Sequence, residues 1–232
     1  MRTTLLAASL FLAAASAQAA PLTSNVTRTP GTSFDTAGIT NFETTGADMA
    51  GMKVTAIFAD SSTRTITWAA TGVGAGAASN AFWGLSLSGD SNTARWSFTN
   101  SGVSQGIIGF IVDGRLGNTT FDTLRDGDTP ATEHSPNSSN GRALTDADGP
   151  ASTGPLTVTY TDKLSVGGTF FGDEYLRMTV LFGGALASGD SLSFLADTDN
   201  ATTLPRNVPE PASLALLGAA LFGLGVVRRK FG

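Results

Sequence analysis

The sequence predicts a mainly β protein, an antiparallel β-sandwich or jelly-roll-like domain with a helix at each end of the chain. Apolar residues recur at every second position with Thr or Ser between them, which is typical of strands with one buried and one wet face. Between the two ends, no comparable stretch combines helical spacing with a cap. Each end is an apolar run beside basic residues, as in membrane-directed segments.

The first predicted element is a secretory signal peptide over residues 1–19. A basic residue precedes the apolar run 5–15, and small residues follow it. Signal peptidase needs small side chains at the third and first positions before the cut, so Ala17 and Ala19 predict cleavage before Ala20. The run is too short to span the hydrocarbon core, which disfavours a permanent anchor or a buried helix.

The exported domain is predicted to span residues 20–207, enough for one ordinary hydrophobic core. It holds 10 of the 14 basic and 18 of the 19 acidic residues, a formal charge of −8. Such an acidic surface disfavours nucleic-acid binding. The chain has no cysteine, so we expect packing alone to hold the fold, with neither disulfides nor a Cys-ligated metal and with no cofactor.

Seven segments carry the strand pattern, and most have their apolar residues on one face. In chain order they are "STRTITWAA" (Ile66, Trp68), "AFWGLSLSGD" (Trp83, Leu85, Leu87), "ARWSFTN" (Trp96, Phe98), "GIIGFIVDG" (Ile108, Phe110, Val112), "PLTVTYTD" (Leu156, Val158, Tyr160), "EYLRMTVLF" and "SLSFLAD". Short strands of this kind are expected to form two packed sheets.

Three connections interrupt the strands. "AATGVGAGAASNA" is a Gly/Ala-rich connection whose "GVGAGA" lacks the following helix that a dinucleotide site needs. Residues 125–155 are rich in turn formers and predict a long surface loop. The tetrapeptide Ser-Gly-Asp-Ser occurs at 88–91 and 188–191, which we interpret as one hairpin turn used twice.

Two letter patterns resemble hydrolase motifs. "GDSL" contains Ser191, but the one histidine, His134, lies upstream, whereas that esterase family needs it downstream. "GVSQG" around Ser104 fits a nucleophile elbow, but the predicted strand that follows replaces the helix which the elbow requires. We therefore expect no enzyme activity, with a secreted hydrolase as the weakest alternative.

Three Asp-x-Asp pairs are the candidates for a metal site. Their carboxylates could hold Ca²⁺, although none completes an EF-hand loop, or they could form ordinary Asp turns. A glycosidase pair is disfavoured, because no pair is flanked by the aromatic platform that a sugar site needs. One histidine and no cysteine exclude a typical zinc site. We expect ordinary turns and no bound metal; the weak calcium candidates are Asp126, Asp128, Asp146, Asp148, Asp197 and Asp199.

The last predicted element covers residues 208–232. Pro209, Glu210 and Pro211 precede the apolar run 212–227, which would be about 24 Å long as a helix and would insert as a single transmembrane segment. A basic cluster ends the run and is expected to stay cytoplasmic by the positive-inside rule. That cluster is Arg228, Arg229 and Lys230.

The stretch "VPEPASLALLGAALFGLGVVRRK" resembles the PEP-CTERM sorting signal of exported bacterial proteins, a segment also catalogued at the C-terminus of ice-binding proteins. The resemblance implies a Gram-negative host and an exosortase that reads Pro209, Glu210 and Pro211 and removes the helix. It also implies transient anchoring in the inner membrane, then delivery to the cell surface or extracellular matrix. The domain's "GMKVTAIFAD", "DGRLGNTTFD" and "SFLADTDN" are similar to domains that carry this signal.

For the mature domain we expect a non-enzymatic structural role in an exopolysaccharide-containing matrix or biofilm. An adhesive module for carbohydrate or ice is the alternative, because "TRTIT" (63–67) and "TVTYT" (157–161) place threonines in rows on one strand face. Threonine also suits any solvated strand face, so the rows alone do not separate the two.

Overall fold

The computed structural model describes residues 19–29, 38–125, 141–166 and 169–202, and every structural statement below concerns these residues. Residues 1–18 of the predicted signal peptide and the whole predicted C-terminal helix lie outside them. In the described ranges no helix is long and apolar enough to cross a membrane. The helices there are short 3-10 turns, namely η1 (Gly46–Met49), η2 (Arg115–Gly117) and η4 (Ala151–Thr153).

The chain is mainly β, as predicted, and its strands form two sheets. The seven-stranded sheet has the order β1 (Ala20–Pro21), β12 (Thr145–Gly149), β15 (Ser191–Leu195), β9 (Trp96–Asn100), β8 (Trp83–Ser88), β7 (Ala75–Ser79) and β6 (Ala69–Gly72). All of its neighbouring strands pair antiparallel.

The nine-stranded sheet is organised around the long strand β14 (Thr169–Leu186). One edge of β14 pairs with β13 (Leu156–Val166), which in turn pairs with β2 (Ser24–Arg28). The other edge is shared by two strands. One is β10 (Ile107–Asp113), continued by β4 (Lys53–Phe58) and β5 (Thr63–Thr67); the other is β11 (Thr119–Asp122), continued by β16 (Asp199–Ala201) and β3 (Ile39–Asn41).

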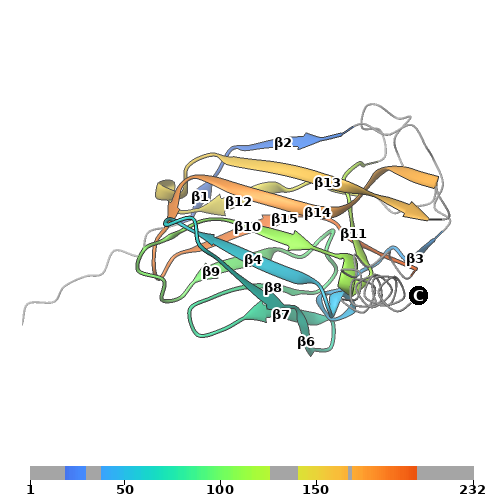
Figure 1. Ribbon diagram of the computed structural model, residues 1–232, viewed down its shortest axis with the longest axis horizontal. Coiled ribbons are helices and arrows are strands. Elements are labelled where there is room, and N and C mark those ends of the chain that lie inside the picture. Colours follow the sequence, from blue (N-terminus) through green and yellow to red (C-terminus); the bar gives the residue numbers. More distant parts are fainter. Residues whose placement is uncertain (1–18, 30–37, 126–140, 167–168, 203–232) are drawn as a thin grey trace, which may run out of the picture.

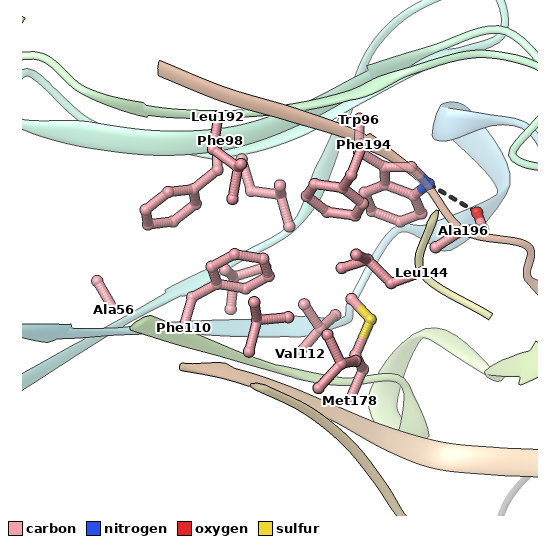
Figure 2. Close-up of a cluster of buried hydrophobic side chains, with 14 of the residues drawn as sticks. Ala56, Trp96, Phe98, Phe110, Val112, Leu144, Met178, Leu192, Phe194 and Ala196 are labelled. Atoms are coloured by element: carbon pink, nitrogen blue, oxygen red, sulfur yellow. Dashed lines mark hydrogen bonds between the residues drawn. The ribbon is translucent and has the colours of Figure 1, made fainter. Parts of the chain in front are cut away.

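The hydrophobic core lies between the two sheets, as Figure 2 shows. Phe98 of β9 stacks on Phe110 of β10 with ring centroids 4.6 Å apart, and Phe110 also lies 5.8 Å from Phe194 of β15. All three rings are fully buried. Truncating one such ring to alanine costs about 3 to 5 kcal/mol in typical cores, so this contact is a main source of stability in a chain without cysteine.

Most of the predicted inward residues are buried, but one strand differs from its prediction. The pattern over 107–113 predicted Ile108 on the core face, whereas Ile107 is fully buried and Ile108 is only partly buried. A register shift between Ile107 and Gly109 causes the difference, because a bulge adds one residue and moves the preceding side chain to the other face.

Four predictions about connectivity need correction. The Gly/Ala-rich stretch 69–81 is not a connection but forms β6 and β7, in which small buried residues alternate with less buried ones along β7. Strand β2 pairs parallel with β13, although only antiparallel strands were expected. Strand β12 lies inside the predicted loop 125–155, because Ala147 alternates with polar residues and packs into the core. The second Ser-Gly-Asp-Ser is no hairpin, because it joins β14 of one sheet to β15 of the other.

Candidate functional site

The structure separates the three Asp-x-Asp pairs that the sequence singled out. Asp146 is exposed and Asp148 forms an ion pair with Arg95, so this pair on β12 belongs to the surface. Asp126 and Asp128 lie outside the described residues. The third pair, Asp197 and Asp199, is buried and has acidic neighbours that sequence spacing did not indicate.

These neighbours come from β11 and β14. Asp122 at the end of β11 pairs directly with Glu174 of β14, and Thr120 pairs with Asp199 of β16. Residues directly opposite in an antiparallel pair share a face, as do residues two apart in a strand. The register therefore brings Asp122, Glu174 and Asp199 together on one face. Asp173, next to Glu174, and Asp197, just before β16, also act electrostatically on Asp122. These five residues are called here the carboxylate cluster: Asp122, Asp173, Glu174, Asp197 and Asp199.

The carboxylate cluster is closed to solvent. Asp197 is 1% exposed and the other four members are 0% exposed. One ligand oxygen from each of Asp122, Asp173 and Glu174 lies within 4.8 Å of the others. Figure 1 places β11 and β3 together at one end of the molecule, so the cluster lies at the end of the nine-stranded sheet where β11, β14 and β16 meet.

Few hydrogen bonds reach these carboxyl oxygens. Asp197 Oδ1 accepts from Ser91 Oγ and from the Thr198 amide, both at 2.8 Å. The Leu124 amide donates to Asp122 Oδ1 at 3.3 Å. Several buried oxygens have no donor among the described residues: Asp122 Oδ2, Asp197 Oδ2, both of Glu174 and both of Asp199.

Burial raises the pKa of Glu174, and the nearby Thr120 hydroxyl opposes that rise. This hydroxyl donates to the main-chain oxygen of Asp199 at 3.4 Å. Contact between the Asp199 and Glu174 carboxyls is repulsive when both are ionised, and it becomes a hydrogen bond only if one is protonated. Protonation of one of the two would satisfy a single oxygen and leave the others of this pair without a donor.

The surrounding backbone holds the carboxylate cluster in place. The Thr123 amide and hydroxyl both donate to the Asp173 carbonyl, at 3.2 and 2.9 Å. The Arg142 amide donates to the Asp122 carbonyl at 2.9 Å, which draws Gly141 against the Asp122 carboxylate. In Figure 2, the indole of Trp96 donates to the Ala196 carbonyl at 2.8 Å, directly before Asp197.

Burial dominates the electrostatics of the site. It raises the pKa of Asp122 and of Glu174 well above the ordinary carboxyl range, and the neighbouring carboxylates raise both further. Burial, then the charge of Asp199, raises the pKa of Asp197 to about 8, against the lowering effect of the Ser91 hydrogen bond. Burial also raises the pKa of Asp199 to about 7, and the Glu174 contact moderates this rise.

Four of the five carboxyl groups have no ion-pair partner among the described residues. The ion pairs between described residues include none of Asp122, Glu174, Asp197 and Asp199. Arg142 is the basic side chain that acts on Asp197, but burial lowers the pKa of its guanidinium, and Asp146 is its ion-pair partner at 3.9 Å. Chemically, the site is a closed set of carboxyl oxygens which, once deprotonated, has the ligand chemistry of a hard cation.

The two serines of the hydrolase-like motifs lie apart from the carboxylate cluster. Ser104 is exposed in the turn before strand β10, and Ser191 is exposed at the start of β15. His134 lies outside the described residues, as do the sorting residues Pro209, Glu210 and Pro211 and the basic cluster Arg228, Arg229 and Lys230. Ala19 is exposed, directly before β1, and Ala17 lies outside the described residues.

The predicted threonine rows do come together. Thr159 of β13 pairs with Thr27 of β2 on one side and with Thr179 of β14 on the other. Ile111 of β10 continues the row, since it pairs with Thr179 and with Thr55 of β4. Thr55 then pairs with Thr65 of β5, whose hydroxyl lies 2.7 Å from its own. This threonine row, Thr27, Thr159, Thr179, Ile111, Thr55 and Thr65, crosses six strands.

The comparison with known families concerns the C-terminal segment. Residues 207–230 match the family model of the PEP-CTERM protein-sorting motif. The chain therefore carries a sorting motif that implies processing by an exosortase, export and sorting to the cell surface. No curated protein and no solved structure matches the chain.

Proposed function

We propose that this protein is an exported, exosortase-sorted component of an exopolysaccharide-containing surface matrix or biofilm, in which its β domain acts as a structural element and not as an enzyme. The observation that carries the proposal is the sorting motif at 207–230. Before processing, the helix 212–227 holds the chain in the inner membrane, and Arg228, Arg229 and Lys230 keep its end cytoplasmic.

The domain supports a non-catalytic role through its architecture. A serine hydrolase needs its nucleophile within hydrogen-bond reach of a base, in a site that admits substrate. Ser104 is followed by a strand and not by the helix of a nucleophile elbow, and Ser191 begins a strand. The buried carboxylates are closed to solvent, so they offer no cleft to a glycoside.

The threonine row favours a second candidate function, adhesive binding of carbohydrate or ice. Neighbouring strands lie about 4.8 Å apart, so the row presents methyl groups at a regular spacing across the outer face of the nine-stranded sheet, with a hydroxyl at every position except Ile111. A regular face of this kind suits a repetitive ligand surface better than a small soluble molecule.

The sorting proposal is tested by comparing four chains in the source cell: wild type, a truncation lacking residues 209–232, Glu210→Ala, and His134→Ala. We expect the truncation to lose surface retention, because neither membrane hold nor recognition motif remains. Glu210→Ala should keep the membrane-held precursor but lose its processing, which intact-mass measurement detects. His134→Ala should match the wild type in retention, mass and matrix formation.

Two results would contradict this proposal. Surface retention that survives the truncation would overturn sorting by the C-terminal segment. Ester or glycoside turnover that is present in the wild type and disappears in His134→Ala would overturn the non-enzymatic role, and Ser104→Ala and Ser191→Ala would then identify the nucleophile.

A further inference from the structure

The carboxylate cluster has no function in the sorting and matrix role, and its chemistry calls for a partner. Glu174 is 0% exposed and neither of its carboxyl oxygens has a hydrogen-bond donor among the described residues. Both carboxyl oxygens of Asp199 and one of Asp122 also lack a hydrogen-bond donor among the described residues. Burying an ionised carboxylate without a partner is strongly unfavourable, so these groups are either protonated or balanced by a cation that binds among them.

The spacing of three members fits one ion. Ca²⁺ binds oxygen ligands at about 2.3 to 2.6 Å, so two ligands of the same ion lie at most about 5 Å apart. The ligand oxygens of Asp122, Asp173 and Glu174 lie within 4.8 Å of one another. The Glu174 oxygen of this group is one of the two that have no hydrogen-bond donor among the described residues.

The ligand set selects the kind of ion. All three residues offer oxygen, and no His or Cys belongs to the group, so zinc and other metals that prefer nitrogen or sulfur are disfavoured. Mg²⁺ retains several waters in a strict octahedron, which a group closed to solvent does not favour. Ca²⁺ accepts several carboxylates in a flexible geometry, and it is plentiful in the space outside cells to which the sorting motif leads.

We propose that Asp122, Asp173 and Glu174 bind one Ca²⁺, with Asp199 beside Glu174 completing the acidic surroundings. The ion joins β11 to β14 directly, and through Asp199 it secures β16, the last described strand before the sorting motif. Metal binding is thereby coupled to closure of this end of the nine-stranded sheet. Asp197 is held separately, by its bonds to Ser91 and Thr198.

The test uses the full chain purified in detergent and stripped with EDTA, with CaCl₂ as the probe. Titration calorimetry should show one Ca²⁺ per chain. At a hundredfold excess over Kd, the Tm should rise by about 5 to 10 °C, as expected for a ligand that binds only the folded state of a domain this size. MgCl₂ should give a much smaller rise.

Isosteric variants test the assignment to residues. Glu174→Gln and Asp122→Asn remove one charge each without changing side-chain shape, so each should fold in EDTA and lose the Ca²⁺-dependent rise in Tm. The matched control is Asp146→Asn, an exposed Asp of the β12 pair, which should respond as the wild type does. The two variants are independent, so a folding defect in one leaves the other to decide.

Three outcomes would overturn the proposal. A wild-type Tm that is unchanged by CaCl₂ would mean that protons alone neutralise the carboxylate cluster. A full response in both Glu174→Gln and Asp122→Asn would place the ion elsewhere. An equal rise with MgCl₂ would exclude a site selective for Ca²⁺. None of these outcomes bears on surface retention, so the proposed function is tested separately.

Discussion

Gly141 shows how a single residue sets the shape of the carboxylate cluster. A Cβ at this position would overlap both carboxylate oxygens of Asp122. The backbone is fixed there by the bond from the Arg142 amide to the Asp122 carbonyl, so the glycine cannot move away without breaking it. The absence of a side chain thus lets the chain close over a carboxylate.

We predict that Gly141→Ala weakens Ca²⁺ binding at least tenfold and destabilises the domain by about 1 to 3 kcal/mol, the usual cost of overpacking a buried site. Calorimetry and urea unfolding measure the two effects. The matched control is Gly102→Ala, whose Cβ would meet nothing nearer than Phe82 Cδ1 at 3.5 Å. Equal losses in the two variants would show that the contact with Asp122 has no special role.

At the scale of elements, the threonine row depends on the register of six strands. Thr159 and Thr179 face away from the core because their neighbours Val158, Tyr160 and Val180 are buried. A long charged side chain in the middle of the row would break its regular surface without touching the core.

We therefore predict that the double variant Thr159→Lys, Thr179→Lys lowers adhesion to purified exopolysaccharide, or inhibition of ice growth, at least tenfold. A pull-down assay and thermal hysteresis measure the two activities. Thr99→Lys, on β9 of the other sheet, is the control and should bind as the wild type does. If the double variant keeps full activity in both assays, the threonines only solvate a strand face.

The same elements show what the sequence could and could not predict. Alternation of apolar and polar residues predicted the main strands, because the buried face of a strand is visible within its own few residues. It misplaced Ile108, since a bulge in β10 depends on its neighbours β4 and β14. It also identified Asp197 and Asp199 as calcium candidates but missed Asp122, Asp173 and Glu174. A search by spacing finds ligands close in the chain, whereas only the pairing of β11 with β14 unites these three.

At the scale of the whole molecule, the domain and the sorting motif are closely tethered. Strand β16 ends at Ala201, and the Pro-Glu-Pro of the sorting motif begins at Pro209. The chain between these two residues can span at most roughly 28 Å when fully extended. On the sorting route proposed above, this short tether would keep the end of the domain that carries the carboxylate cluster close to the membrane before processing.

We predict that deleting residues 203–206 slows exosortase processing severalfold, because the folded domain would crowd the motif. A ten-residue Gly/Ser insertion after Thr202 should process at least as fast as the wild type. The ratio of precursor to processed chain by intact mass measures both. Equal rates in all three chains would show that tether length does not limit access.

The pairing of early strands with late ones has a kinetic consequence. Strand β1 pairs with β12, β2 with β13, and β3 with β16, each more than a hundred residues further along the chain. Contacts this distant in sequence slow folding, because a large loop must close before any of them forms. Strands that leave the cytoplasm first must wait unpaired for nearly the whole domain to follow. A C-terminal helix that holds the chain at the membrane would give the sheets time to close before release.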